Sequence, residues 1–271
     1  MICASDLHTH STASDGQYSP SELVALAHAR GVEAMALTDH DTIDGVAEAQ
    51  HAGERLGVRV IPGIELSAKE YHTFHILGYA FDTGASGLNA LCARMKSGRD
   101  EREQRIIDYL GGCGMPLTLA EVEEIAGGRI IGRPHFAQAM VRRGYVADNR
   151  EAFDRWLDTE EFHARVERPK PSARECVETI KAAGGFVSLA HPYQIGVDDA
   201  ALDAIVRELT EYGLDAIECF YPKFTPEQQT CYLRLAKKYG LHQTGGSDFH
   251  GERVKPDIAL AALELDVGWL L

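Results

Sequence analysis

Short apolar runs that end at or beside histidine, acidic or other polar residues recur along this chain, and helix-like segments separate most of them. This alternation is typical of βα units, which build parallel sheets. In a (β/α) barrel the carboxyl ends of the strands open onto one face, where active sites are built. Side chains far apart in the sequence are therefore expected to meet at that face. The runs are residues 1–7, 34–38, 58–64, 74–79, 186–190, 216–220 and 241–246.

The segment between the first two runs carries a clear helix start. Ser19-Pro20-Ser21-Glu22 has the form of a capping box with proline at the first helical position. An amphipathic pattern follows to about Arg30, where Gly31 ends it. The first two strands are therefore predicted to be joined by a helix.

Residues 99–170 break the alternation. They predict helices over 99–110, 119–126, 134–143 and 150–157, without a convincing strand. Eleven of the twelve cationic residues in this stretch are arginines, which suit bidentate recognition of phosphate or carboxylate groups. We expect a barrel in two parts, 1–98 and 171–271, with residues 99–170 as a helical insertion that caps the substrate. A chain of 271 residues suits one barrel with one insertion.

Charge and apolar content exclude several classes of function. The formal net charge is −14, whereas proteins that coat duplex nucleic acid need a basic face. No window approaches the roughly 18–20 apolar residues that span a bilayer, and the start lacks the features of a secretory signal. The six cysteines are scattered without a C-x-x-C pair, which is typical of reduced thiols. We expect a cytoplasmic protein without membrane contact or stable duplex binding.

His8 and His10, at the end of the first run, are the first candidate metal ligands. Alternation along an extended backbone places both imidazoles on the same side, so both can reach one cation. Alone, this pair is a weak signal. Seven further imidazoles and carboxylates stand at or beside the predicted strand ends. So many unpaired groups at one face of a barrel would carry large electrostatic and desolvation costs, which bound divalent cations would offset. These residues are Asp15, His40, Glu65, His75, His191, Asp248 and His250.

Five of these segments, taken in order, resemble the motifs of the polymerase and histidinol phosphatase (PHP) family. The resemblance implies a distorted (β/α)7 barrel that holds up to three divalent metal ions. It assigns His8, His10, Glu65 and Asp248 to the first ion, Glu65, His75 and His191 to the second, and Asp15, His40 and His250 to the third. The motifs are His8-Thr9-His10-Ser11, Thr38-Asp39-His40-Asp41, Gly63-Ile64-Glu65, Ala190-His191-Pro192 and Gly246-Ser247-Asp248-Phe249-His250.

The resemblance also bears on the metal and the reaction. Some relatives have histidine where this chain has Asp15, and the carboxylate favours Mn²⁺, with Fe²⁺ and Zn²⁺ as alternatives. Metal ions about 3.5–4 Å apart can generate a bridging hydroxide and stabilise an in-line displacement at phosphorus, so no protein nucleophile is required. We expect Glu65, His191 and Asp248 to be the catalytic residues.

Gly132-Arg133-Pro134-His135 opens a predicted helix inside the insertion, where Arg133 and the helix N-terminus could bind an anion. With Tyr221-Pro222-Lys223, this motif resembles a PHP subgroup of nucleoside 3′,5′-bisphosphate phosphatases and tryptophan-operon-associated-like proteins. The resemblance implies removal of the 3′-phosphate from adenosine 3′,5′-bisphosphate, which yields AMP and phosphate. It implies that Arg133, His135 and Lys223 contact the small, doubly phosphorylated nucleotide.

Other activities stay open at this point. A 5′-to-3′ exonuclease would act on short oligonucleotides, because the sequence shows no basic groove with interleaved aromatics for longer strands. A histidinol phosphate phosphatase fits less well, since the arginine-rich insertion suits an anionic substrate. A C–N bond amidohydrolase and a non-catalytic metal-binding accessory domain are the alternatives from other classes.

Overall fold

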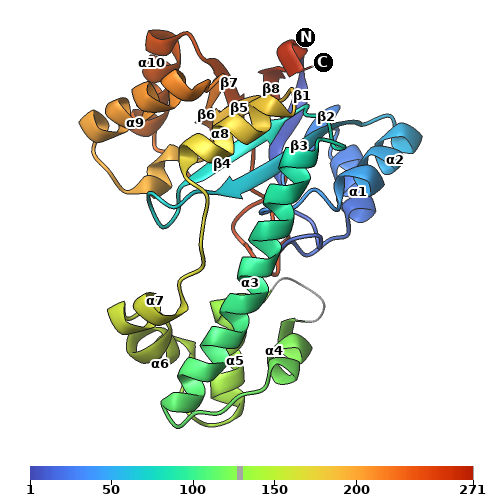
Figure 1. Cartoon of the computed structure of the whole chain (residues 1–271). Coiled ribbons are helices and arrows are strands. Elements are labelled where there is room, and N and C mark those ends of the chain that lie inside the picture. The colour runs from blue at the N-terminus through green and yellow to red at the C-terminus, as the bar shows by residue number, and fades with distance from the viewer. Residues whose placement is uncertain (127–130, 271) are drawn as a thin grey trace. The chain divides into compact units, whose positions relative to one another are not determined.

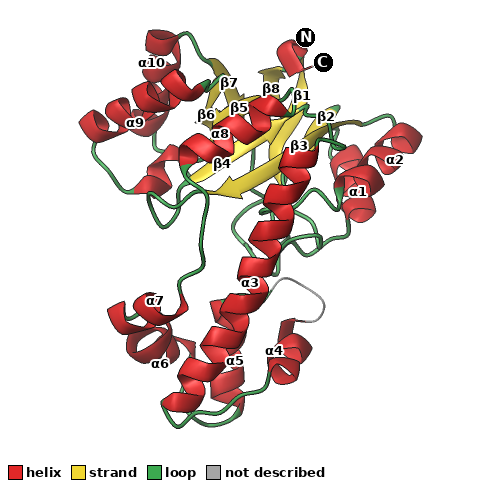
Figure 2. Cartoon of the chain, in the orientation of Figure 1, coloured by secondary structure: helices red, strands yellow, loops and turns green. Residues whose placement is uncertain are grey.

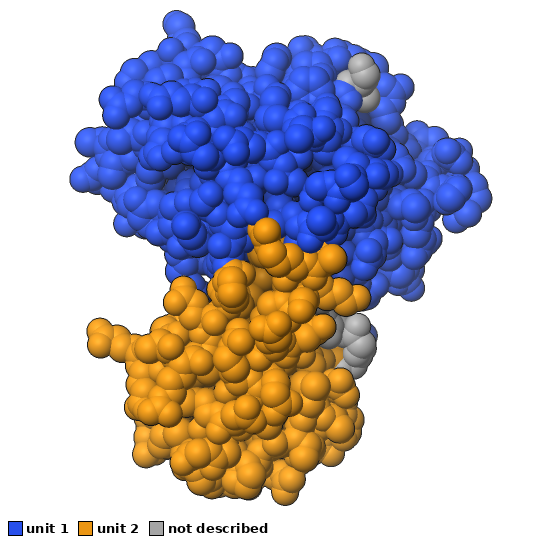
Figure 3. Space-filling view, viewed as in Figure 1, with its two compact units in different colours: residues 1–92, 170–271 blue, residues 93–169 orange. Residues whose placement is uncertain are grey.

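The computed structural model describes residues 1–126 and 131–270, which divide into two compact units. One unit contains residues 1–92 and 170–271, and the other contains residues 93–169 (Figure 3). The first holds every strand of the described chain and the second is wholly helical. We call them the barrel unit and the helical unit.

The barrel unit is built on an eight-stranded sheet with the order β7-β6-β5-β4-β3-β2-β1-β8 (Figure 1). Four neighbouring pairs are parallel, namely β1 with β2, β2 with β3, β5 with β6 and β6 with β7. β4 is antiparallel to both β3 and β5, and β8 is antiparallel to β1. The strands are β1 (Ile2–Thr9), β2 (Ala34–Leu37), β3 (Arg59–Ser67), β4 (His75–Tyr79), β5 (Phe186–Leu189), β6 (Ala216–Phe220), β7 (His242–Gly245) and β8 (Leu263–Asp266).

The chain that follows β7 closes the sheet against β1. The Asp248 amide donates to the His8 carbonyl at 2.8 Å, and the His10 amide donates to the Phe249 carbonyl at 3.0 Å. Gly246 permits this approach, because a Cβ atom there would lie 2.4 Å from the His8 Cβ atom. The result is a nearly closed, distorted barrel of the α/β class, which confirms the expected fold class.

Helices cover the outside of this sheet (Figure 2). The predicted capping box is present, because Ser19 Oγ accepts from the Glu22 amide and the Glu22 carboxylate accepts from the Ser19 amide at 2.9 Å. In β2, the small Ala34 and Ala36 belong to one buried cluster, and the larger Met35 belongs to another with residues of α1 and α2. The helices are α1 (Pro20–Ala29), α2 (Val46–Leu56), α8 (Ala173–Ala182), α9 (Asp199–Tyr212) and α10 (Pro226–Tyr239), with 3-10 turns at Pro192–Ile195 and Gly268–Leu270.

The helical unit has a core of its own, centred on Leu110, Phe136 and Phe162. α3 begins in the barrel unit at Ser86, thirteen residues before the predicted start at residue 99, and the predicted helix over 150–157 is a short α-helix followed by a π-helical turn. No helix in the described part of the chain is both long enough and apolar enough to cross a bilayer. The elements are α3 (Ser86–Gly112), α4 (Leu119–Ala126), α5 (Arg133–Arg142), α6 (Asn149–Ala152), the turn Phe153–Leu157 and α7 (Glu160–Val166).

Candidate metal centre

The nine predicted metal ligands all lie in the barrel unit, at the rim where the parallel strands end. His75 is the first residue of β4, and it reaches this rim because β4 runs against its neighbours. Ligand atoms of eight of the nine form three groups in which all atoms lie within 4.8 Å of one another. The groups are His8, His10, Glu65 and Asp248; His40, Glu65 and His75; and His10, Asp15, His40 and His250.

The first group is fully buried. His8 Nε2 and His10 Nε2 each lie 3.2 Å from Glu65 Oε2. Asp248 Oδ1 is 3.4 Å from His10 Nε2 and 3.8 Å from His8 Nε2. Two imidazole nitrogens and two carboxylate oxygens thus face one small space between β1, β3 and the chain after β7.

Glu65 joins the groups because its two oxygens face different imidazoles. Oε1 lies 2.9 Å from His75 Nδ1 and 2.9 Å from His191 Nε2, while Oε2 lies 3.0 Å from His40 Nδ1. His191 Nε2 is also 3.3 Å from His75 Nδ1. The ninth residue, His191, therefore lies against the same carboxylate, although none of the three groups includes it.

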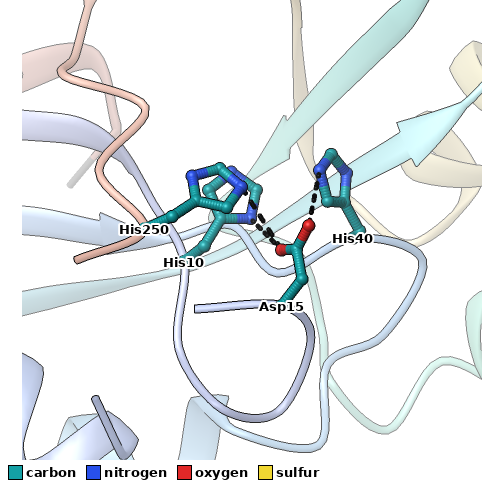
Figure 4. Close-up of side chains that lie close together, drawn as sticks. All are labelled: His10, Asp15, His40 and His250. Carbon is teal, nitrogen blue, oxygen red and sulfur yellow. Dashed lines mark ion pairs between the residues drawn. The ribbon is translucent and has the colours of Figure 1, made fainter. Parts of the chain in front are cut away.

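The third group surrounds Asp15 (Figure 4). His250 Nε2 is 3.3 Å from Asp15 Oδ1, and His40 Nε2 is 3.9 Å from Asp15 Oδ2. The His10 and His250 rings stack with their centres 4.0 Å apart, and His10 Nδ1 lies 3.9 Å from Asp15 Oδ1. The Asp15 side chain is 41% exposed, so this group meets solvent where the first group does not.

Several atoms of the cluster are buried without a hydrogen-bond partner among the described residues. Buried polar atoms are rarely left so, since each costs about 1–3 kcal/mol. Three of the imidazole nitrogens lie 3.0–3.2 Å from Glu65 Oε2 but not in hydrogen-bonding geometry. Nitrogen and carboxylate donors of this kind fit Mn²⁺, Fe²⁺ or Zn²⁺. The atoms are His8 Nε2, His10 Nδ1 and Nε2, His40 Nδ1, Glu65 Oε2 and His191 Nδ1.

Burial and neighbouring charges shift several pKa values in the cluster, as is common at functional sites. Burial opposes the charged form of His10, but the carboxylates of Asp248 and Glu65 outweigh it and raise its pKa to about 9. Burial also opposes a charged Glu65, yet the surrounding imidazoles hold its pKa well below the usual range. Burial lowers the pKa of His40 to about 3. Coordinated imidazoles must be neutral, so cations in this cluster would displace protons from His10.

Backbone strain marks two of the same residues. His191 has φ 22° and Asp248 has φ 54°, in the left-handed region that side chains rarely adopt. Strain of this kind costs about 1–3 kcal/mol and persists where the surrounding structure enforces it, often at functional sites. His191 is the second residue after β5 and Asp248 is the third residue after β7.

Sequence reasoning missed the polar residues behind the ligands. Glu218, fully buried in β6, accepts from His8 Nδ1 at 3.0 Å and from the His191 amide at 2.6 Å. Lys255 Nζ lies 2.7 Å from Asp248 Oδ2. The available signal for Glu218 was a lone acid within the apolar run of residues 216–220, which a buried strand tolerates only when the charge is paired.

The predicted substrate contacts lie in different units. Arg133, the first residue of α5, forms an ion pair with Asp158, and His135 Nδ1 accepts from the Gly132 amide at 3.0 Å. Both belong to the helical unit, whereas Lys223 is exposed in the loop after β6 of the barrel unit.

An arginine cluster in the helical unit was also missed. Burial and the neighbouring charges of Arg133, Arg168 and Arg105 lower the pKa of Arg102 to about 10. Arg102 Nε donates to the Val166 carbonyl at 3.1 Å. The positive charges of these arginines oppose one another, and an anion beside them would relieve that repulsion.

Known proteins resemble the chain over both units. A sequence profile for the PHP domain matches residues 6–160. The chain is 36% identical over 246 residues to a 5′-3′ exoribonuclease of Haemophilus influenzae, covering 90% of this chain and 89% of that protein. It is 34% identical over 251 residues to a phosphoribosyl 1,2-cyclic phosphate 1,2-diphosphodiesterase of Eggerthella lenta, covering 91% and 94%. It is 31% identical over 247 residues to a 3′,5′-nucleoside bisphosphate phosphatase of Chromobacterium violaceum, covering 90% and 86%.

A solved structure resembles the chain as well. A Bifidobacterium adolescentis protein, proposed to be a metal-dependent phosphoesterase, shares 31% sequence identity with a TM-score of 0.81. The similarity covers 98% of this chain and 95% of that one. The likeness therefore extends over both the barrel unit and the helical unit.

Proposed function

Because the chain belongs to the PHP domain family, we propose that it is a metal-dependent phosphoesterase that removes the 3′-phosphate of nucleoside 3′,5′-bisphosphates. With adenosine 3′,5′-bisphosphate the products would be AMP and phosphate. The observation that carries the proposal is the buried rim cluster, in which six nitrogen and oxygen atoms are buried without a hydrogen-bond partner among the described residues. Phosphoryl transfer needs such positioned charge more than it needs a protein nucleophile.

We propose that the cluster binds up to three divalent ions, with Mn²⁺ favoured over Fe²⁺ and Zn²⁺. When bound, such ions supply Lewis acidity and an activated water. Glu65 would serve two of them, since its oxygens face different imidazoles. The proposed ligands are His8, His10, Glu65 and Asp248 for the first ion, Glu65, His75 and His191 for the second, and Asp15, His40 and His250 for the third.

Each of the proposed catalytic residues has a role that its contacts support. Glu65 holds five imidazoles around one buried carboxylate. His191 brings its Nε2 atom to that carboxylate from a strained backbone, and Asp248 closes the first group from the chain after β7. All three are buried, and their contacts hold the neighbouring imidazoles in place.

Two phosphates in the substrate would explain two separate cationic features. The rim cluster suits the phosphate that is hydrolysed. We propose Arg133 and His135 in the helical unit, and Lys223 in the barrel unit, as the substrate-phosphate contacts. Support comes from the arginine cluster around Arg102, which favours an anion in the helical unit. The Arg133 ion pair with Asp158 is partly exposed, so a phosphate could replace it at modest cost.

The test is phosphate release from adenosine 3′,5′-bisphosphate by protein loaded with Mn²⁺, with His191→Ala as the control. We expect AMP and phosphate in equal amounts from the wild type and release at the background rate from the variant. Phosphate release no faster than that of His191→Ala would refute the proposal. A panel that adds phosphoribosyl 1,2-cyclic phosphate and p-nitrophenyl phosphate ranks the competing substrates named for the relatives.

A second candidate is a 5′-to-3′ exonuclease acting on short oligonucleotides, which the name of the Haemophilus influenzae relative favours. The net charge of −14 disfavours long polyanions, because each added phosphate increases repulsion from the protein surface. Oligonucleotides of two, five and twenty residues separate the candidates. The second candidate predicts kcat/KM for the dimer at least equal to that for the bisphosphate, and a fall with increasing length.

A further inference from the structure

Glu218 is a fully buried acid in the middle of β6, between apolar neighbours. None of the three groups of candidate metal ligands in the described residues contains it. An unpaired carboxylate in such a place would be very costly, so its charge must be balanced by specific partners. Those partners are two of the proposed metal ligands.

One oxygen of Glu218 sets the tautomer of His8. Oε1 lies 3.0 Å from His8 Nδ1, and an ionised carboxylate can only accept, so Nδ1 carries the hydrogen. The lone pair of a neutral His8 is then on Nε2, which lies 3.2 Å from Glu65 Oε2 within the first group. Carboxylates placed behind metal-binding histidines in this way orient the ring and strengthen the ligand.

The other oxygen holds the backbone of His191. Oε2 accepts from the His191 amide at 2.6 Å, at the residue whose φ of 22° is strained. This backbone conformation carries His191 Nε2 to within 2.9 Å of Glu65 Oε1. A charge-assisted hydrogen bond at this amide offsets part of the strain.

We propose that Glu218 is a positioning residue that fixes a ligand of the first ion and a ligand of the second with one carboxylate. The proposal rests on the metal centre of the proposed function but not on the identity of the substrate. No contact joins Glu218 to Asp15, His40 or His250 among the contacts of the described residues, so the third ion should be independent of it. Loss of the Glu218 charge should therefore weaken the binding of the first and second ions and leave the binding of the third unchanged.

The experiment compares Glu218→Gln with Asp215→Asn in the full-length, metal-stripped protein. Both changes replace a carboxylate, in β6 or directly before it, by an amide of equal size, but Asp215 pairs with Lys181 and the Val187 amide, away from the ligands. Mn²⁺ is titrated while free Mn²⁺ is followed by electron paramagnetic resonance, and elemental analysis gives the bound amount. The visible spectrum with Co²⁺ reports ligand geometry.

We expect three Mn²⁺ ions in the wild type and in Asp215→Asn, with equal affinities. In Glu218→Gln two of the three should bind about 10- to 100-fold more weakly, as is usual when a group behind a metal ligand is lost. The third should change less than twofold, and the Co²⁺ spectrum should change only for the weakened ions.

Wild-type affinities at all sites of Glu218→Gln would overturn the proposal, and so would equal weakening of all three ions. If Glu218→Gln does not fold, Glu218→Asp is used instead, because it keeps the charge but has a shorter side chain. Unchanged Mn²⁺ affinities in that variant would also overturn the proposal. A wild type that binds no Mn²⁺, Fe²⁺ or Zn²⁺ would overturn the proposed function itself, which keeps the two failures distinct.

Discussion

At the scale of single residues, the candidate metal ligands are easier to predict from the sequence than the residues that hold those ligands in place. The nine rim residues were predicted because each stands at or beside the end of an apolar run, and strand ends share one face of a barrel. Glu218 was not, because it lies within a strand and its importance depends on His8 and His191, which are remote in sequence. Arg102 was missed for the same reason, since its neighbours are set by the packing of α3, α5 and the chain after α7. The partners of a buried charge depend on the tertiary fold, so local sequence patterns do not predict them.

Arg133 is the residue whose proposed role is easiest to isolate. Arg133→Ala should raise KM for adenosine 3′,5′-bisphosphate by about 10-fold or more, the effect of one lost charge-assisted hydrogen bond. KM for p-nitrophenyl phosphate, which has one phosphate, should stay within twofold. Steady-state kinetics on both substrates measure the difference.

The matched control for this change is Arg150→Ala, also in the helical unit. Arg150 is 89% exposed and pairs only weakly with Asp154, at 3.5 Å. Its loss should leave both KM values unchanged. Equal increases for the two substrates in Arg133→Ala would remove Arg133 from recognition of the second phosphate.

At the scale of elements, all seven apolar runs became strands, because short runs rich in apolar residues suit strands that are buried in a sheet. The antiparallel direction of β4 could not be predicted, because the pattern of apolar residues in a strand is the same whichever way the strand runs. β8 was missed because four residues of alternating polarity give little signal, and its position depends on pairing with β1. The π-helical turn after α6 likewise has no local signature.

Gly246 tests how barrel closure and the metal centre are linked. In Gly246→Ala the new methyl group would meet His8 Cβ at 2.4 Å and the His8 amide nitrogen at 2.5 Å, so β1 and the chain after β7 must separate. We expect the free energy of unfolding to fall by about 1–3 kcal/mol or more, as overpacking does. Mn²⁺ affinity should fall in parallel, because His8 and Asp248 face each other across this contact.

Urea unfolding and Mn²⁺ titration measure the two effects. Gly87→Ala is the control, because a Cβ atom at Gly87 meets nothing within 4 Å. That variant should be as stable as the wild type or slightly more so, with unchanged metal binding. A Gly246→Ala protein with wild-type stability and metal affinity would show that the close approach does not hold the barrel together.

At the scale of the whole molecule, the chain divides its tasks between two units with separate cores. The sequence predicted a helical insertion at 99–170, and the structure draws the compact helical unit over residues 93–169. The acidic balance of the chain made a nucleic-acid function look remote, yet positive charge is concentrated locally. The arginines around Arg102 lie in the helical unit, whereas the metal-competent imidazoles and carboxylates lie in the barrel unit.

Phe162→Ala tests whether the two cores are independent. Phe162 is completely buried in the helical unit, so its truncation should destabilise that unit by about 3–5 kcal/mol. Hydrogen exchange should rise in residues 93–169 and not in the barrel strands, and the bound Mn²⁺ should be unchanged. Loss of metal in this variant would contradict the assignment of the whole metal centre to the barrel unit.

The most direct measurement of the central claim follows both phosphates of adenosine 3′,5′-bisphosphate by ³¹P nuclear magnetic resonance. Aliquots of the reaction with Mn²⁺-loaded enzyme are stopped by chelating the Mn²⁺ before each spectrum is recorded. The 3′-phosphate signal should disappear as inorganic phosphate grows, while the 5′-phosphate signal stays as that of AMP. Prior metal removal or His191→Ala should abolish the change. Accumulation of adenosine 3′-phosphate, or a spectrum that does not change with active-site residues and metal intact, would contradict it.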